Sequence, residues 1–245
     1  MEPKIGIGIR NMNEFSLEDY PFDCYELTSK IGGIEPNILK ILELKEKFKG
    51  KDLSLHTQLG RIFSCIDRGC PEFNEAELNI LKSEIIISKI IGIKQIIFHM
   101  KETEFTKEEI NQFDEIIKYA NENGIELIYE NHVCSEEIIF RVLKTFPKIN
   151  FCLDIGHLNI AIKKGKFKID LNEFLEKTKS KLVNIHAHNN DGMKDTHLSL
   201  DAGNFPWESL LNKLKNKNLR KIIIECKNME DILKSKELLE KYYGK

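Results

Sequence analysis

The seven histidines of this chain lie where short apolar runs end, together with several acidic residues. They are His56, His99, His132, His157, His186, His188 and His197, and the acidic residues at equivalent places are Glu130, Asp154, Asp195 and Glu225. Imidazole and carboxylate groups are a typical ligand set for Zn, Mn, Co or Fe. Carboxylates that converge on one cavity repel one another, and a divalent cation offsets that repulsion. The pattern therefore predicts a metal site.

Alternation along the apolar runs indicates which side chains face the same way. Three pairs of residues two positions apart share a strand face: Ile128 and Glu130, Ile223 and Glu225, and His186 and His188. If these faces point inward, two carboxylates and several imidazoles meet in one cavity. A lone buried carboxylate costs too much free energy, so this convergence again favours a bound cation.

The elements that must position these side chains are short strands in alternation with helices. Eight apolar or β-branched runs are predicted strands: Lys4–Ile9, Cys24–Ser29, Leu53–Gln58, Gln95–Met100, Glu126–His132, Asn150–Ile155, Leu182–His188 and Lys221–Cys226. Seven segments with helical periodicity or capping signals are predicted helices: Pro36–Phe48, Asn74–Ile91, Thr106–Asn123, Ser135–Thr145, Asp170–Lys179, Pro206–Lys215 and Asn228–Tyr242. The first connection, around Asn11–Tyr20, has the weakest helical pattern.

This alternation predicts an α/β protein with a single (β/α)8 barrel, a TIM barrel, over residues 1–245. Each unit has about 30 residues, the size of one strand–helix repeat. A doubly wound open sheet is the competing fold. That fold usually has a glycine-rich phosphate loop after its first strand, whereas Gly6 and Gly8 lie inside the first run and no third glycine follows at the required spacing. Barrel enzymes carry their chemistry at the C-terminal strand ends, where the histidines fall.

Composition excludes several classes of protein. With 245 residues, 41 % hydrophobic content and a net charge of -2, the chain can bury a core and is not disordered. It contains no apolar run of membrane-spanning length, and its start lacks the pattern of a secretory signal. Six cysteines without a C-x-x-C pair are read as reduced thiols, although Cys65 and Cys70 share a loop and could form a bridge. We expect a cytoplasmic protein with no membrane partner.

The motifs at the strand ends resemble those of the xylose isomerase-like TIM barrels. The resemblance rests on Leu55-His56, Phe98-His99, Glu130-Asn131-His132, Leu153-Asp154-Ile155-Gly156-His157, His186-Ala187-His188-Asn189-Asn190-Asp191 and Asp195-Thr196-His197-Leu198-Ser199-Leu200. The segment Asp201–Trp207 is similar to the family's glycine-acidic-glycine stretch, with Asp201 and Ala202 where Gly and Glu are usual. This superfamily includes sugar phosphate isomerases and epimerases, D-tagatose 3-epimerase-like enzymes and the endonuclease IV family, AP endonuclease family 2.

The resemblance to the epimerases implies one divalent metal held by Glu130, Asp154, His188 and Glu225. It also implies that the two glutamates are the catalytic acid and base. One removes a proton next to a carbonyl and the other returns it from the opposite face. The metal, Mn or Zn first and Co, Mg or Fe otherwise, would polarise the carbonyl and stabilise the enediolate oxygens.

Six further side chains are predicted to contact substrate or additional metals: His56, His99, His157, Lys194, Asp195 and His197. The resemblance implies that His157 contacts a substrate hydroxyl near the metal. It also implies a substrate contact for Lys194, because the epimerases have a basic residue six positions after the equivalent of His188. The expected partner is a small sugar, phosphorylated or not, and a homo-oligomer is compatible with the sequence.

The endonuclease branch is the alternative, with nucleic acid as substrate and three zinc ions. Its ligand pattern carries over to nine positions: His56, His99, Glu130, Asp154, His157, His188, Asp195, His197 and Glu225. Against it, Thr57, Gln58 and Leu59 follow His56 where that family has an aromatic residue, and arginines are sparse in the loops that would track phosphates. A metal-binding protein without enzymatic activity is a third class, which leaves the position of so many ligands at strand ends unexplained.

Overall fold

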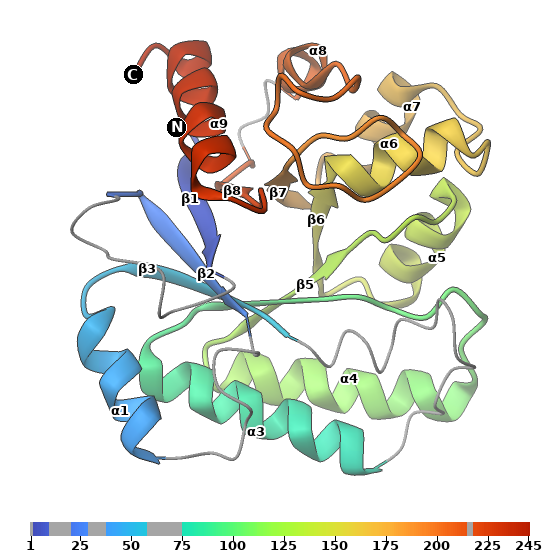
Figure 1. The fold of residues 1–245 in the computed structure, drawn as a ribbon. Coiled ribbons are helices and arrows are strands. Elements are labelled where there is room, and N and C mark those ends of the chain that lie inside the picture. Colours follow the sequence, from blue (N-terminus) through green and yellow to red (C-terminus); the bar gives the residue numbers. More distant parts are fainter. Residues whose placement is uncertain (1, 10–20, 29–37, 58–74, 215–217) are drawn as a thin grey trace. The chain divides into compact units, whose positions relative to one another are not determined.

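The computed structural model of the protein describes residues 2–9, 21–28, 38–57, 75–214 and 218–245. Eight strands form a closed barrel in chain order from β1 to β8, and helices alternate with them along the chain (Figure 1). The predicted single (β/α)8 barrel is therefore confirmed. The competing open sheet is wrong, because a doubly wound sheet leaves two strand edges unpaired.

The strands are β1 (Lys4–Ile9), β2 (Cys24–Thr28), β3 (Asp52–His56), β4 (Gln95–Phe98), β5 (Glu126–Glu130), β6 (Asn150–Asp154), β7 (Leu182–Ala187) and β8 (Lys221–Ile224). Each begins within one residue of its predicted start, and all but β1 end one or two residues early. The predicted runs extended into residues such as His132 and His188, which follow their strands as loop residues. The polar residues that end each run therefore lie at the point where the strand stops.

The helices are α1 (Ile38–Lys47), α3 (Glu75–Ile91), α4 (Lys107–Glu122), α5 (Glu136–Thr145), α6 (Ile155–Lys163), α7 (Leu171–Thr178), α8 (Trp207–Lys213) and α9 (Met229–Tyr243). Seven of them match the predicted segments, and α6 was not predicted. The connection around Asn11–Tyr20 lies outside the described residues. In α4, Thr106 and Glu109 form the predicted capping box, and Gly124 adopts a φ of 72° just beyond the helix.

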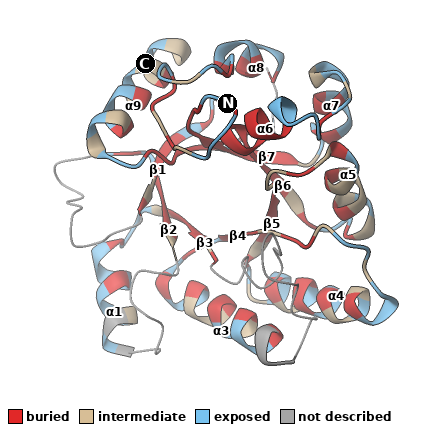
Figure 2. Ribbon diagram, turned by 45° about the vertical axis from the view of Figure 1, so that its right-hand side comes forward, coloured by how far each residue is buried: buried red, intermediate tan, exposed pale blue. Residues whose placement is uncertain are grey.

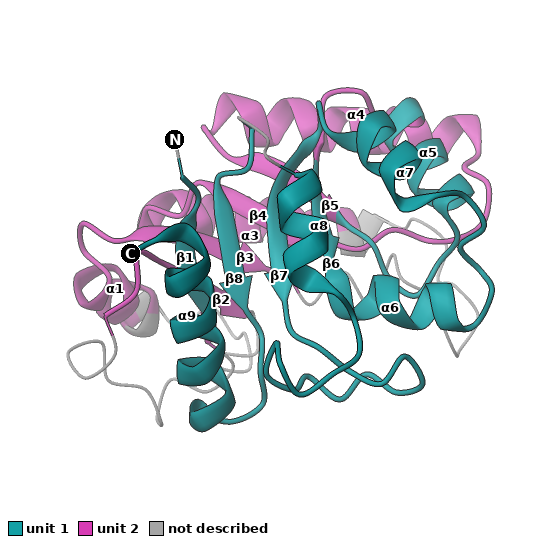
Figure 3. Cartoon of the chain, turned by 90° about the horizontal axis from the view of Figure 1, so that it is seen from above, with its two compact units in different colours: residues 1–7, 130–144, 151–245 teal, residues 8–129, 145–150 magenta. Residues whose placement is uncertain are grey.

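The chain divides into two compact units (Figure 3). Unit 1 comprises residues 1–7, 130–144 and 151–245, and unit 2 comprises residues 8–129 and 145–150. The last residue of β5 and the C-terminal ends of β6, β7 and β8 belong to unit 1. All four predicted metal ligands therefore lie within unit 1.

In unit 1, parallel strands bring the strand ends level with one another. Asp154 of β6 lies opposite His186 of β7, and Ala187 lies opposite Ile224 of β8. The backbone N–H of Glu225 then donates to the carbonyl of Ala187 at 3.1 Å. This register places the polar residues of three successive strands next to one another at the C-terminal ends of those strands.

In unit 2, β2, β3, β4 and most of β5 pair in parallel, and α3 contacts both α1 and α4 (Figure 1). The helices turn buried faces toward the strands and exposed faces outward (Figure 2). Phe113 of α4 packs against Phe98 of β4 with ring centroids 5.4 Å apart. Burial of this kind supplies most of the stability of a helix in a protein.

Four cysteines are buried free thiols, in agreement with the prediction: Cys24, Cys134, Cys152 and Cys226. Cys65 and Cys70 lie outside the described residues, and so does the bridge considered for them. Within the described ranges, no helix is long and apolar enough to cross a membrane.

One buried acid in unit 2 links stability to pH. Glu84 of α3 is 3 % exposed and accepts a hydrogen bond from the Thr57 hydroxyl at 2.6 Å. Burial raises its pKa from 4.5 to about 7, although Thr57 and His56 oppose the shift. A carboxyl with a raised pKa contributes its full stability below pH 4.5, where both states are protonated. That contribution is lost as the pH rises through about 7.

We expect Glu84→Gln to remove this pH dependence while keeping an acceptor for Thr57. The shift corresponds to about 3 kcal/mol, so the unfolding free energy of the variant relative to wild type should rise by up to that amount between pH 4.5 and 7.5. Urea unfolding at a series of pH values measures it. Glu115→Gln on the exposed face of α4 is the control. A constant difference between Glu84→Gln and wild type across this range would contradict the assignment.

Candidate metal centre

The four predicted ligands lie at the C-terminal ends of unit 1 strands. Glu130 is the last residue of β5 and Asp154 is the last of β6, while His188 and Glu225 directly follow β7 and β8. All four are buried, and Glu225 is the most exposed of them at 7 %. The sequence places apolar strand residues immediately before each of them, so the same folding that buries the strands buries these polar groups.

Asp154 is held by contacts to both of its carboxylate oxygens. Oδ1 accepts the backbone N–H of His157 at 2.7 Å and caps α6, and Oδ2 lies 3.1 Å from Nε2 of His188. Asn131 fixes the backbone of Asp154 by donating to its carbonyl at 3.1 Å and accepting its N–H at 2.9 Å. The carboxylate therefore has one orientation, with Oδ2 directed at the imidazole of His188.

His186 lies between the two glutamates predicted to be acid and base. Its Nδ1 is 2.9 Å from Oε1 of Glu130 and 3.6 Å from Oε1 of Glu225. The imidazole is fully buried. One ring nitrogen thus faces both carboxylates and is within hydrogen-bond distance of Glu130.

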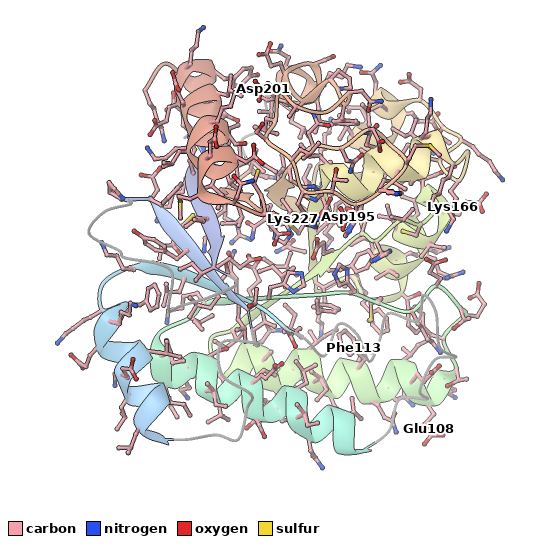
Figure 4. The ribbon with its side chains drawn as sticks, in the orientation of Figure 1. Glu108, Phe113, Lys166, Asp195, Asp201 and Lys227 are labelled. Atoms are coloured by element: carbon pink, nitrogen blue, oxygen red, sulfur yellow. The ribbon has the colours of Figure 1, made fainter. Side chains whose placement is uncertain are left out.

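Asp195 brings a fourth carboxylate to this edge of unit 1. It lies on the loop between β7 and α8 (Figure 4), and its side chain is 38 % exposed. Its oxygens are 3.0 Å from Nε2 of His197, 3.5 Å from Nε2 of His157 and 3.9 Å from Nε2 of His188. Three imidazole nitrogens therefore surround one carboxylate.

The rings of His157 and His197 are each oriented by a hydrogen bond to a backbone carbonyl. Nδ1 of His157 donates to the carbonyl of Asn131 at 3.1 Å, and Nδ1 of His197 donates to the carbonyl of Glu225 at 2.6 Å. This leaves Nε2 of each ring directed at Asp195. Metal-binding histidines are typically held in this way, with one ring N–H on a backbone carbonyl and the other nitrogen on the metal.

The backbone of His197 is strained. Its φ of 52° is the one positive value among the described non-glycine residues. The ring stacks on His188 with centroids 3.8 Å apart and planes at 21°. A left-handed conformation at such a residue costs about 1–3 kcal/mol and persists only where the surroundings impose it. The strain is typical of a functional site.

Unit 1 contains three sets of three donor atoms, each set lying within 4.8 Å: Glu130, Asp154 and His186; Asp154, His188 and Glu225; and His188, Asp195 and His197. Nδ1 of His188 is buried and has no hydrogen-bond partner among the described residues. Buried polar atoms are rarely left in this state. The donor sets fit a divalent cation that prefers mixed imidazole and carboxylate ligands.

The ionised carboxylates of the cluster stabilise positive charge on neighbouring groups. Burial raises the pKa of Asp154, but the neighbouring His157 and His188 outweigh it and hold that pKa well below its usual range. Burial alone would lower the pKa of His157, but the neighbouring Asp154 and Asp195 outweigh burial and raise that pKa to about 10. The carboxylates therefore stay ionised and attract either protons on the imidazoles or a cation.

Three further predicted residues are His56, His99 and Lys194. His56 and His99 belong to unit 2, where their rings form a pair with centroids 5.3 Å apart. The side chain of Lys194 is exposed, and its described electrostatic partner is Asp191 rather than a cluster residue. The substrate contact predicted for Lys194 therefore stays a prediction.

Two contributors were absent from the predicted site. His186 shares a strand face with His188, and this alternation was the sequence signal for it. Asn131 follows Glu130 directly, but its bonds to the backbone of Asp154 join residues 23 positions apart, so no local pattern indicates them.

Comparison with known proteins gives a family. The sequence profile described as xylose isomerase-like TIM barrel matches residues 17–242. The uncharacterized protein MJ1311 of Methanocaldococcus jannaschii is 31 % identical over 150 residues, which is 57 % of this chain and 50 % of that protein. The chain spans about half the length of the first curated relatives it matches.

Solved structures share the fold over nearly the whole chain. A D-tagatose 3-epimerase-like protein has a TM-score of 0.75 and 22 % identity, covering 98 % of this chain and 97 % of its own. The IOLI protein with a bound zinc atom has a TM-score of 0.72 and 16 % identity, with coverage of 98 % and 97 %. At identities this low, the likeness establishes the fold alone.

Gly156 tests whether the position of His188 controls metal binding. A Cβ at Gly156 would lie 2.0 Å from Cε1 of His188, so the ring must move from its present position. We expect Gly156→Ala to weaken Co²⁺ binding at least about tenfold, the usual effect of disturbing a ligand's orientation. Isothermal titration with Co²⁺ measures it.

Gly165→Ala is the matched control for that substitution. Gly165 has a φ of 67°, and a Cβ there meets nothing within 4 Å. Its replacement strains the backbone near the end of α6 without touching His188. It should lower the melting temperature and leave Co²⁺ affinity unchanged. Equal Co²⁺ affinities in both variants and wild type would show that the ring of His188 does not bind the ion.

Proposed function

This chain belongs to the xylose isomerase-like TIM barrel family, and from that membership we propose that it is a divalent-metal-dependent isomerase or epimerase of sugars or sugar phosphates. The observation that carries the proposal is the buried set Asp154, His188 and Glu225, whose donor atoms lie within 4.8 Å of one another. The names of several structural neighbours, which are 3-epimerases of ketoses, support the same class of chemistry.

We propose Glu130, Asp154, His188 and Glu225 as the residues that would hold the metal. Mn or Zn is the expected ion, with Co, Mg or Fe as alternatives, because the ligands are carboxylates and an imidazole. A bound cation would polarise the substrate carbonyl and stabilise the negative charge that develops on its oxygen. The convergence of these donor atoms and the lowered pKa of Asp154 support this occupancy.

Glu130 and Glu225 are proposed to move the proton. One carboxylate removes the proton from the carbon next to the carbonyl, and the other returns a proton from the opposite face. His186 is proposed to orient Glu130, because its Nδ1 lies 2.9 Å from Oε1 of Glu130 and 3.6 Å from Oε1 of Glu225. His157 is proposed to contact a substrate hydroxyl, and Lys194 to contact the substrate from the loop after β7.

An endonuclease IV-like phosphodiesterase acting at abasic sites is the second candidate. The observation in its favour is the further donor set His188, Asp195 and His197, which exceeds what a single metal requires. It ranks second because a duplex substrate needs a basic track along its phosphates. The arginines nearest to the predicted barrel mouth, Arg61 and Arg68, lie outside the described residues. We further propose a cytoplasmic protein with a small sugar as its partner, compatible with a homo-oligomer.

Parallel assays test the proposed function. Free ketohexoses, ketose phosphates and a duplex with one abasic site are incubated with protein loaded with Mn²⁺ or Zn²⁺, and metal is counted per chain. We expect ketose turnover, no nicking and about one tightly bound ion. Nicking without sugar turnover, together with three ions per chain, would reverse the order of the two candidates. Less than about a tenth of an equivalent of metal after metal-replete growth would contradict both.

Glu225→Gln should abolish turnover of the accepted ketose without unfolding the chain. The amide keeps the shape of the side chain but cannot exchange a proton, and general acid–base groups contribute about a hundredfold to ten-thousandfold in rate. Turnover and the melting temperature are measured together. Glu230→Gln, on the exposed first turn of α9, is the control and should retain wild-type turnover. A Glu225→Gln variant within tenfold of wild type would remove Glu225 from the proton-transfer role.

A further inference from the structure

The loop between β7 and α8 is held together by hydrogen bonds from the side chain of Asn189, which lies near the start of the loop. Asn189 Oδ1 accepts the backbone N–H of Asn190 at 2.9 Å and of Phe205 at 3.1 Å, and its Nδ2 donates to the carbonyl of Leu200 at 2.7 Å. Gly203 leaves room for this amide, since a Cβ there would lie 2.2 Å from Asn189 Oδ1. The two ends of the loop are therefore joined at its base, and the segment that carries Asp195 is closed by these bonds.

Asn159 of α6 joins this loop to the helix. Its Nδ2 lies 3.1 Å from the carbonyl of Asn190, 2.9 Å from Oδ1 of Asn190 and 2.8 Å from Oδ1 of Asn204. Asn204 is itself bound to Asn190, because its backbone N–H donates to that residue's carbonyl at 3.0 Å. The buried amide group of Asn159 thus contacts the loop both near its start, at Asn190, and near its end, at Asn204.

The same helix begins at Asp154. The carboxylate of Asp154 caps α6 through the N–H of His157, so the position of α6 and the position of this carboxylate are coupled. The loop on the other side of Asn159 carries His188 at its start and Asp195 further along. The amide of Asn159 therefore connects the helix capped by Asp154 to the loop that carries His188 and Asp195.

We propose that Asn159 is a positioning residue that sets the separation of the Asp154 carboxylate from His188 and Asp195. Its effect on turnover rests on the proposed function, whereas its effect on the geometry of the imidazoles does not. The residue touches neither the metal nor the substrate in this role. It acts through Asn190 and Asn204.

The chemistry of the contact requires an amide. Three oxygen atoms converge on one nitrogen donor, so a carboxylate at this position would place oxygen against oxygen in a buried place. Asn159→Asp keeps the size of the side chain and removes the donor. Asn159→Ser keeps a hydroxyl donor on a shorter side chain, which makes it the milder variant if Asn159→Asp does not fold.

Thr178→Val supplies a matched control within unit 1. The hydroxyl of Thr178 is buried and donates to the carbonyl of Phe174 at 2.9 Å at the end of α7. Valine removes that buried hydrogen bond without changing the shape of the side chain. Any loss of stability that follows from one missing buried bond appears in this variant too.

The test uses the full chain and two measurements. In the metal-free protein, the imidazole nitrogen signals of His188 and His197 are recorded by NMR, and Co²⁺ affinity is measured by titration. Both Asn159 variants should shift the two imidazole signals and weaken Co²⁺ binding about tenfold to a hundredfold. Thr178→Val should change neither. Wild-type signals and wild-type Co²⁺ affinity in folded Asn159 variants, with only a lower melting temperature, would overturn the proposal.

The outcomes also separate this proposal from the proposed function. If the wild-type protein binds Co²⁺ but turns over no ketose, the proposed function fails while the effect of Asn159 on the signals and on Co²⁺ affinity is still decided. If the wild-type protein binds no Co²⁺, the metal proposal fails, and the imidazole signals alone decide: shifted signals support a positioning role and unchanged signals overturn it.

Discussion

The site depends on one electrostatic constraint, the burial of several carboxylates at one edge of unit 1. Asp154, Glu130 and Glu225 are all almost completely removed from water, and burial of unpaired charge is among the most costly events in folding. The chain offsets that cost with imidazoles. Each of these carboxylates has a histidine nitrogen within 3.6 Å. Beside Asp154, the raised pKa values of His157 and His188 favour protonated, positively charged rings. A cation would displace those protons, so metal loading and pH are coupled in a site of this kind.

Much of the fold, and the polar residues that lie at the strand ends of unit 1, could be predicted from the sequence. The reason is that a barrel places its chemistry where each apolar run stops, so Glu130, Asp154 and Glu225 are marked by the strands before them. Both ends of α4 could also be predicted, because Thr106 is a typical N-cap residue and Gly124 is the residue type that most easily adopts a left-handed conformation. These features are local, and local patterns decide them.

The features that escaped prediction depend on contacts between distant segments. Helix α6 begins directly after β6, and its apolar residues continue the apolar run of the strand, so no turn residue separates the two. Asn159 acts through partners 31 and 45 positions away. His186 was visible by its alternation with His188, but its place between Glu130 and Glu225 follows from how β5, β7 and β8 end in space. Such contacts leave no periodicity in the sequence.

The left-handed backbone of His197 has an evolutionary and practical consequence. Glycine and asparagine adopt a φ of 52° with less strain, so backbone conformation alone would favour either of them at this position. Histidine at this position has a strained backbone, but its ring stacks on His188 and donates to the carbonyl of Glu225. A substitution that relieves this backbone strain would also remove one donor atom of the proposed metal centre.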